Sequence, residues 1–379
     1  MDQTAIDLEQ RVLTLIAHGV AQPTAGEEFD QLARAVFAFQ FERCTPYRAY
    51  CEHLKLTPQT VMHWKEVPAV PTSAFKEFAL TCFPIEEAVA EFHTSGTTRE
   101  KAGKHYLRTT ELYEAAIRPN FAEHLLGGHS PNNGGRDARP TLPMMVLAPA
   151  PEEAPHSSLS YMIGVVMREF GAADSSYYVE GGHLLVEKLV RDLCEAQWAH
   201  QPVFLLGTAF AFVHLFDHLA QQNLKFEMSA GSRAMETGGF KGRSRELAKT
   251  DLYALFEKFL GIPATRVVNE YGMTELSTQF YDLTMQAGRR TDVKAVVPWA
   301  RVLIIDPNTG RETANNEERG LIRVFDLANL WTMMCIQTED LGSVVGDPPS
   351  GLRGFEVFGR AAGTEVRGCS LNAETLGMI

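Results

Sequence analysis

VVNEYGMTE, residues 267–275, is the stretch of sequence that decides the fold class. It opens with two β-branched residues, which favour a buried strand, and continues into a glycine turn bearing an aromatic ring, a hydroxyl and a carboxylate. Turns at the ends of strands are where α/β folds bind ligands. Tyr271 can lie on the face of a nucleobase, Thr274 can bond a phosphate, and Glu275 can bind Mg²⁺, which prefers carboxylate and phosphate oxygens. The alternative is an ordinary strand-to-helix connection with a capping threonine.

Short apolar runs on both sides of this stretch alternate with segments of helical periodicity. The runs expected to form strands are residues 144–148, 203–206, 266–268, 302–305 and 321–325. Helices are expected over residues 183–195 and 208–221 and over much of the first 60 residues, where apolar side chains recur at helical spacing. This alternation predicts an α/β protein with a largely buried sheet. Residues 127–140, rich in Gly, Asn and Pro, are expected to form a loop.

Composition argues against several classes of function. The chain has 379 residues with a formal net charge of −12 and no Lys/Arg block, which argues against nucleic-acid binding. Its longest apolar run, residues 203–216, is shorter than the roughly 20 residues of a membrane span. The N-terminus shows no secretory signal, so we expect a cytoplasmic protein. Six cysteines without metal-ligand spacing predict reduced thiols and no structural zinc site.

A second polar stretch, HTSGTT at residues 93–98, precedes a group of cations. Its hydroxyls and backbone N–H groups, together with the ammonium groups that follow, can wrap a polyphosphate. It lacks the spacing of the G-x-x-x-x-G-K-[ST] phosphate loop, and the alternative is a surface turn. The candidate phosphate-binding residues of this stretch are Thr94, Ser95, Gly96, Thr97 and Thr98.

HTSGTT followed far along the chain by NEYGMTE resembles the adenylate-forming superfamily, which includes acyl-CoA synthetases, firefly-type luciferases and phenylacetate-CoA ligases. Three further segments follow this resemblance: METGGFK at 235–241, ERGLIRV at 318–324 and TEDLG at 338–342. A fourth, FGR at 358–360, is similar to the hinge before the superfamily's small C-terminal domain. The implied fold is α/β, a large N-terminal domain with mixed sheets flanked by helices.

The resemblance also implies roles for individual residues. Gly238, Gly239 and Tyr271 would bind adenine, and Asp340 and Arg360 would bind ribose. Thr274 would join residues 94–98 at the phosphates of ATP, and Glu275 would bind Mg²⁺.

Two departures concern the lysine that assists adenylation. Superfamily members carry it in a domain beyond the hinge, whereas here only residues 361–379 follow Arg360 and none is a lysine. We therefore expect a truncated C-terminal appendage. Arg99, Glu100 and Lys101 also stand where many members have Gly-x-Pro-Lys. The candidates for the lysine that faces the phosphates are Lys101, Lys104 and Lys241.

The C-terminal sequence resembles one branch of the superfamily. VPAVPTSAFK at 67–76, GFEVFGR at 354–360 and EVRGCSL at 365–371 are similar to segments of the acyl-protein synthetases of bacterial fatty acid reductase complexes, which serve bioluminescence. The implied domains are 1–60, an N-terminal helical segment of the large domain, 61–353, the adenylate-forming core, and 354–379, a short segment carrying the acyl-acceptor cysteine.

In that branch a cysteine near the C-terminus accepts the acyl group and passes it to a partner reductase, and Cys369 matches it. A thiolate suits this task, and a nearby Arg367 would raise the thiolate fraction. The alternative is that Cys369 is a packing residue. The remaining cysteines are expected to be packing residues or idle thiols; they are Cys44, Cys51, Cys82, Cys194 and Cys335.

An acyl pocket is predicted around LLGTAFAFV, residues 205–213, where a small-residue turn joins a buried strand to an apolar helix. In related adenylate-forming enzymes this helix borders the acyl site, so the candidate residues are Gly207, Thr208, Phe210 and Phe212. The alternative is helix core. His214 and His218 have a spacing that can hold a metal ion, but no third ligand suggests itself and none is expected there.

These patterns together predict an ATP-dependent, AMP-forming ligase. It would activate a fatty acid or another carboxylic acid as acyl-AMP with ATP and Mg²⁺, acylate its own Cys369, and deliver the thioester to a partner acyl reductase. One alternative is an acyl-CoA or acyl-carrier ligase that uses an external thiol. Another is a degenerate relative that binds nucleotide or a partner without turnover.

Overall fold

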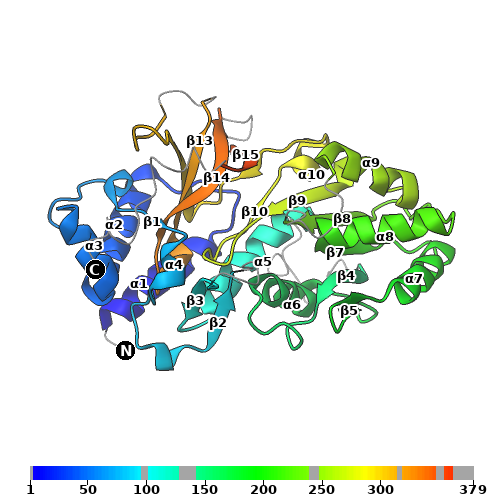
Figure 1. The fold of residues 1–379 in the computed structure, drawn as a ribbon, viewed down its shortest axis with the longest axis horizontal. Coiled ribbons are helices and arrows are strands. Elements are labelled where there is room, and N and C mark those ends of the chain that lie inside the picture. The colour runs from blue at the N-terminus through cyan, green and yellow to red at the C-terminus, as the bar shows by residue number, and fades with distance from the viewer. Residues whose placement is uncertain are drawn as a thin grey trace. The chain divides into compact units, whose positions relative to one another are not determined.

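The computed structural model describes residues 3–94, 101–127, 142–238, 247–313, 318–346 and 354–361. The chain forms two compact units (Figure 1). The first comprises Met1–Asn120, Met273–Thr278 and Val293–Ile379, and the second comprises Phe121–Gly272 and Gln279–Asp292. The division at residues 60 and 353 expected from the sequence stays a prediction. Apart from residue 127, the predicted loop at 127–140 lies outside the described residues.

Helices dominate the N-terminal part of the first unit, as predicted. α1 buries Ala5, Leu8, Val12, Leu15 and Ile16, whose three- and four-residue spacing forms one apolar face. The helices of this unit are α1 (Gln3–Ala17), α2 (Gly26–Arg43), α3 (Thr45–His53), α4 (Ala74–Glu77) and the first part of α5 (Glu111–Leu126). Its 3₁₀ turns are η1 (Trp64–Glu66), η2 (Ile85–Glu87) and η4 (Leu327–Asn329).

The first unit contains a six-stranded sheet in the order β11-β15-β14-β13-β12, with β1 pairing alongside β14. Its strands are β1 (Val70–Pro71), β11 (Lys294–Ala295), β12 (Ala300–Ile305), β13 (Gly320–Asp326), β14 (Cys335–Val345) and β15 (Gly354–Arg360). All pairs are antiparallel except β1 with β14. The strands predicted at 302–305 and 321–325 are confirmed. A separate hairpin pairs β2 (Ala90–His93) with β3 (Lys104–Leu107).

The second unit is built on a seven-stranded sheet in the order β10-β9-β8-β7-β4-β5-β6. The five central strands are parallel. The two at the centre of the sheet, β4 and β7, are almost wholly apolar, as expected for strands buried on both faces. The strands are β4 (Met144–Pro149), β5 (Ser176–Glu180), β6 (His183–Leu184), β7 (Phe204–Thr208), β8 (Arg233–Thr237), β9 (Val267–Tyr271) and β10 (Phe280–Tyr281). The strands predicted at 144–148, 203–206 and 266–268 are confirmed.

The helices of the second unit flank this sheet, and α8 packs on β7 (Figure 1). They are the end of α5, α6 (Ser158–Phe170), α7 (Val186–Trp198), α8 (Ala209–Gln221), α9 (Lys249–Leu260) and α10 (Thr284–Ala287), with the 3₁₀ turn η3 (Ala264–Arg266). Phe212 and Phe216 of α8 meet Phe256 of α9 in the core. The prediction of a mixed α/β fold with sheets flanked by helices is confirmed.

The start of the helix predicted at 183–195 is wrong. His183 and Leu184 form β6, which pairs with Val179 and Glu180 of β5, and α7 begins only at Val186. The cause is the pair Gly181 and Gly182, whose φ angles of +55° and +81° allow a two-residue hairpin turn. The helix predicted at 208–221 is confirmed, with Thr208 as its N-cap.

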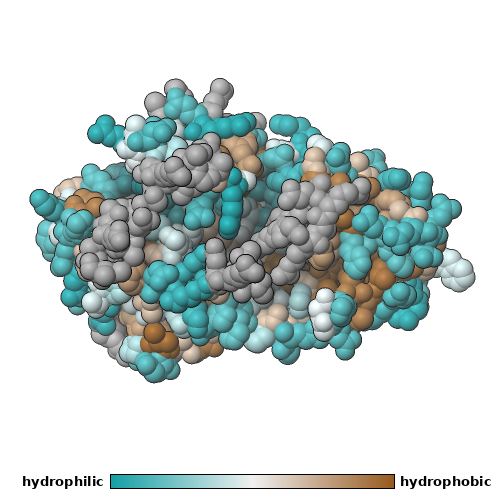
Figure 2. All heavy atoms as spheres, viewed as in Figure 1, coloured by the Kyte–Doolittle hydropathy of each residue, from teal (hydrophilic) through white to brown (hydrophobic). Residues whose placement is uncertain are grey.

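Hydrophilic side chains cover much of the face shown in Figure 2, because the large apolar residues fill the cores of the two units. Among the described residues, no helix is both long enough and apolar enough to cross a membrane.

Candidate functional site

The hairpin of β2 and β3 brackets the predicted phosphate loop. At its base, the Thr94 N–H donates to the Gly103 carbonyl at 2.9 Å, and the Gly103 N–H donates to Thr94 Oγ1 at 2.8 Å. A Cβ at Gly103 would lie 3.1 Å from Thr94 Cγ2 and 3.4 Å from Phe75 Cβ, so glycine permits this close approach. Thr94 is the one described residue of the five predicted in this loop; residues 95–98 lie outside the described ranges.

The two described lysine candidates differ in their partners. Lys104 Nζ lies 2.7 Å from Glu91 Oε1, and this bond raises the pKa of Lys104 and lowers that of Glu91. His93 Nε2 also bonds the Glu91 carboxylate. Lys101 is two-thirds exposed, and its Nζ lies 3.8 Å from Glu77 Oε2. Lys241 lies outside the described residues.

The turn carrying Thr274 and Glu275 belongs to the first unit, and buried polar side chains hold its C-terminal part. Asp326, fully buried at the end of β13, accepts from the N–H groups of Ser277 (3.0 Å) and Thr278 (2.9 Å). Thr278 Oγ1 also donates to Asp326 at 2.8 Å. Burial raises the pKa of Asp326 to about 6, although these donors lower it. Asp326 therefore fixes the backbone just beyond Glu275.

Asn329 and His105 hold the same turn at its centre. Asn329 Nδ2 donates to the Glu275 carbonyl at 2.8 Å, and Ser277 Oγ donates to Asn329 Oδ1 at 2.6 Å. On β3, His105 Nδ1 lies 2.7 Å from the Thr274 carbonyl oxygen. Sequence reasoning missed Asp326, Asn329 and His105. No short motif contains them together with the turn, and the His105 contact spans 169 residues of chain.

The side chain of Glu275 is buried, and the charges of the predicted ribose residues, half-buried Asp340 and exposed Arg360, act on its pKa. The residue is only 7% exposed, and burial raises the pKa of its carboxyl to about 7. Arg360 opposes this increase, whereas Asp340 and Glu339 add to it. Asp340 of β14 and Arg360 of β15 are direct cross-strand partners. The structure thus brings together three residues that the sequence places far apart.

The predicted adenine residues lie in the second unit, at the carboxyl ends of adjacent parallel strands. Thr237 at the end of β8 pairs in register with Glu270 of β9, and their side chains are hydrogen-bonded. Gly238 follows with a φ of +76°, and Tyr271 is half-buried with its ring 6.3 Å from that of Phe280. Gly239 lies outside the described residues. Gly238 and Tyr271 therefore lie at one edge of the sheet, where α/β folds bind ligands.

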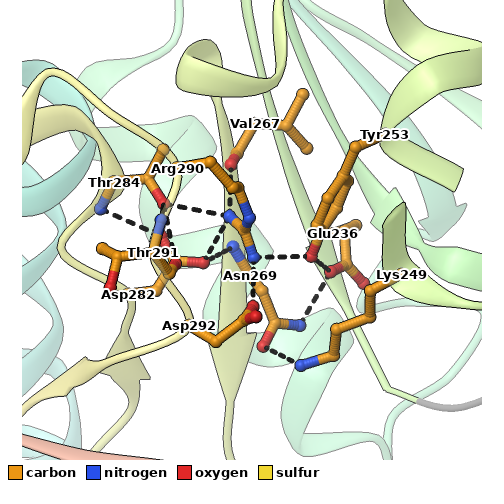
Figure 3. Close-up of polar contacts among 10 residues, drawn as sticks. All are labelled: Glu236, Lys249, Tyr253, Val267, Asn269, Asp282, Thr284, Arg290, Thr291 and Asp292. Atoms are coloured by element: carbon orange, nitrogen blue, oxygen red, sulfur yellow. Dashed lines mark hydrogen bonds and ion pairs between the residues drawn. The ribbon is translucent and has the colours of Figure 1, made fainter. Parts of the chain in front are cut away.

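A buried polar network supports β8 and β9 beneath this edge (Figure 3). Glu236 accepts from Tyr253 Oη and from Asn269 Nδ2, each at 2.8 Å. Arg290 donates to Tyr253 Oη at 3.0 Å and lies over its ring, 4.1 Å from the centroid. Arg290 also donates to Asp282 at 2.9 Å, and Asp282 accepts from the Asn269 N–H at 2.8 Å. The network links the two strands to the segment that follows them.

Packing explains two of the four predicted acyl-pocket residues. A Cβ at Gly207 would lie 2.8 Å from Leu147 Cβ, so glycine permits the close approach of β4 and β7. Phe212 is fully buried, with its ring 4.7 Å from that of Phe256, as the helix-core alternative expects. Thr208 and Phe210 are partly exposed. The acyl-pocket role of these four residues stays a prediction.

The described cysteines fall into two groups. Four are buried, and burial raises the pKa of Cys44 to about 11 and of Cys51 and Cys335 to about 12. Burial also raises the pKa of Cys82. Cys194 on α7 is exposed. Cys369 lies outside the described residues.

The chain is similar to known proteins in its sequence and in its fold. The family described as "Acyl-protein synthetase, LuxE" matches residues 27–376. No curated protein matches the chain. A 2-hydroxyisobutyryl-CoA ligase crystallised with 2-HIB-AMP and CoA is similar in structure, with a TM-score of 0.62 and 16% identity over 90% of this chain and 71% of that one. ATP-bound MatB from Rhodopseudomonas palustris gives a TM-score of 0.50 and 16% identity over 75% of this chain and 50% of that one. At this identity the two ligases show a common fold.

Proposed function

The chain belongs to the acyl-protein synthetase family of the LuxE type, a family of ATP-dependent ligases, and we propose that it activates a fatty acid as acyl-AMP and then acylates its own Cys369. The observation that carries the proposal is the buried carboxyl of Glu275, whose pKa responds to the charges of the cross-strand partners Asp340 and Arg360. A buried carboxylate beside a cross-strand acid–guanidinium pair suits a nucleotide and a divalent cation.

In the first half-reaction the fatty acid carboxylate attacks the α-phosphorus of ATP, and the bond to the departing pyrophosphate breaks. Thr94 and Thr274 would bond the phosphates, with Lys101 as the preferred lysine because Lys104 is already bonded to Glu91. Asp340 would accept from the ribose hydroxyls, and Arg360 would donate to the nucleotide. These residues position reactants and stabilise charge, which is the main need of phosphoryl and nucleotidyl transfer.

Glu275 fits the role of a Mg²⁺ ligand. Burial without a directly bonded cation raises the pKa of its carboxyl, so a divalent cation beside it would restore the charged form. Mg²⁺ is commonly held by one or two carboxylates together with substrate phosphates. When bound, it would neutralise charge on the phosphates of ATP. Asn329 would keep Glu275 in place through the bond to its carbonyl.

In the second half-reaction the Cys369 thiolate would attack the acyl carbonyl. A carbon–sulfur bond forms, the carbon–oxygen bond to AMP breaks, AMP leaves with the electron pair, and the thiol proton passes to solvent. Burial and raised pKa values argue against four other cysteines as acceptors, because they keep the thiolates of Cys44, Cys51, Cys82 and Cys335 scarce and inaccessible. Cys194 is the exposed thiol that provides a matched control. The thioester would then pass to a partner acyl reductase.

Self-acylation can be tested with ATP, Mg²⁺ and labelled tetradecanoate. Wild type, Cys369→Ala and Cys194→Ala are incubated, separated on a denaturing gel and treated with hydroxylamine, while pyrophosphate is measured in parallel. We expect hydroxylamine-labile label on wild type and Cys194→Ala and none on Cys369→Ala, with pyrophosphate released by all three.

Other outcomes contradict the proposal in distinct ways. Label that persists in Cys369→Ala assigns the acceptor elsewhere. If the protein takes up no label but forms acyl-CoA when coenzyme A is added, the acyl acceptor is an external thiol. A wild-type protein that releases no pyrophosphate with fatty acids from eight to eighteen carbons, with or without a reductase, supports a binding protein without turnover.

A further inference from the structure

His105 is a buried histidine on the strand that leaves the predicted phosphate loop. It is 2% exposed, and its ring meets that of Phe75 edge to face at 6.0 Å. Its Nδ1 lies 2.7 Å from the Thr274 carbonyl oxygen, and its Nε2 lies 2.9 Å from Thr332 Oγ1. Both ring nitrogens therefore have partners, and both partners lie far away along the chain.

The two partners fix the tautomer of His105. A carbonyl oxygen only accepts, so Nδ1 carries the proton and donates to Thr274. Nε2 is then bare and accepts the hydroxyl proton of Thr332. Burial lowers the pKa of His105 to about 4, so the ring is neutral near pH 7. The ring is therefore a neutral, oriented bridge and not a charged ligand.

The ring of His105 holds Thr274, which the hairpin of β2 and β3 contacts twice. Thr274 Oγ1 donates to the backbone carbonyl of His93 on β2 at 3.3 Å, while the Thr274 carbonyl accepts from His105 on β3. Both strands that bracket the loop therefore bond to Thr274, the residue directly before Glu275. A shift of the turn would break one bond or the other.

We propose that His105 is a positioning residue that holds Thr274 and Glu275 in register with Thr94 and the hairpin of β2 and β3. The inference rests on the proposed function, in which these elements hold the phosphates of ATP and its cation. His105 acts through the backbone of Thr274 and does not itself touch the nucleotide. When groups that position a substrate shift by about 1 Å, the rate can fall on the order of a hundredfold. Loss of the bond from His105 to Thr274 should therefore have a measurable effect on the rate.

Three substitutions separate the two bonds of the ring. His105→Asn retains a donor near the position of Nδ1 and loses the bond to Thr332. His105→Gln places its amide near Nε2 and loses the donor to Thr274. Thr332→Val removes the hydroxyl partner of Nε2 and leaves the Thr274 bond in place, so it is the matched control for loss of a buried hydrogen bond.

The first readout is amide hydrogen exchange in the substrate-free protein. We expect His105→Gln to speed exchange in peptides covering residues 273–278 while β12 and β13 stay as in wild type. His105→Asn and Thr332→Val should leave the turn protected. Unchanged protection of the turn in His105→Gln, or an equal rise throughout the first unit, would overturn the proposal.

The second readout is pyrophosphate release at varied ATP. We expect kcat/KM for ATP to fall about tenfold or more in His105→Gln and to stay within about threefold of wild type in His105→Asn and Thr332→Val. The thermal unfolding midpoint of each variant is measured in parallel. If the loss of activity simply parallels the loss of thermal stability in all variants, the role of His105 is merely structural. If wild type releases no pyrophosphate, the proposed function fails, and the exchange experiment still decides whether His105 holds the turn.

Discussion

Asp340 on β14 lies directly opposite Arg360 on β15, and the charges of both residues act on the pKa of the buried carboxyl of Glu275. Arg360 lowers the pKa of Glu275, Asp340 raises it, and burial, the largest effect, brings it to about 7. The three side chains thus form one charge-coupled group on the first unit. A nucleotide whose ribose meets Asp340 would therefore lie within electrostatic reach of a cation held by Glu275.

Replacement of Asp340 tests the ribose assignment. In Asp340→Asn the charged acceptor becomes a neutral amide, so we expect the KM for ATP to rise about tenfold, with a smaller change in kcat. Initial rates of pyrophosphate release at varied ATP measure this. The matched control is Glu339→Gln, because Glu339 also raises the pKa of Glu275 but, as the adjacent residue of the strand, faces the opposite side. An equal rise in KM for both variants would contradict the assignment.

The phosphate lysine can be identified by comparing two variants. Lys104 is bonded to Glu91, whereas Lys101 is largely exposed with only a distant carboxylate. We therefore expect Lys101→Met to lower the rate of pyrophosphate release by about tenfold or more, and Lys104→Met to lower it less. The reverse order would assign the role to Lys104. Equal rates for both variants and wild type would leave Lys241 as the candidate.

Asp326 makes stability depend on pH. Its pKa is about 6 in the folded protein, against an ordinary value of 3.8, because the carboxyl is fully buried. The folded state then binds more protons than the unfolded state between pH 4 and 6, so this group's contribution to stability rises as pH falls from 7 to 5. The full difference amounts to at most about 3 kcal/mol.

Urea unfolding of wild type and Asp326→Asn at pH 5 and 7 measures this contribution. The Asn side chain cannot titrate. It also replaces a carboxyl that accepts from several backbone N–H groups, so the loss of these hydrogen bonds makes the variant less stable than wild type at both pH values. We expect the gap between wild type and variant to be wider at pH 5. A gap that widens toward pH 7 would contradict a raised pKa.

The network in Figure 3 predicts an unequal response to loss of two tyrosine hydroxyls. Tyr253→Phe removes a donor to buried Glu236 and an acceptor for Arg290. We expect a loss of about 1–3 kcal/mol in the free energy of unfolding. Tyr178→Phe is the control, because Asp192, the partner of Tyr178, is partly exposed and can be hydrated. Denaturant curves that give equal losses for the two variants would show that the hydroxyl of Tyr253 adds no more stability than that of Tyr178.

Local patterns in the sequence predicted the elements but not the contacts that hold the turn. The β-branched pair and glycine turn at 267–275 predicted β9 and the turn after it, since these signals lie within a few residues. The bonds from His105 to Thr274 and Thr332 span 169 and 227 residues, so no spacing reveals them. The sequence also contained no sign that Gly207 lies against Leu147, a contact between two strands 60 residues apart in the chain. Pairing between distant segments decides such details.

Thiol alkylation gives a test of the acceptor that needs no labelled acid. The pKa values of Cys44, Cys51 and Cys335 are raised to about 11–12 by burial, so their thiolates are rare at pH 8 and shielded from reagent. We expect N-ethylmaleimide to modify native protein at Cys194 and Cys369, as intact mass and peptide mapping would show. Prior incubation with ATP, Mg²⁺ and fatty acid should protect Cys369 alone, because a thioester sulfur does not alkylate. If Cys194 is protected equally, the substrates have changed the folding of the protein or the access of the reagent to it, and acylation is not shown. If Cys369 is not protected, its role as acceptor is contradicted.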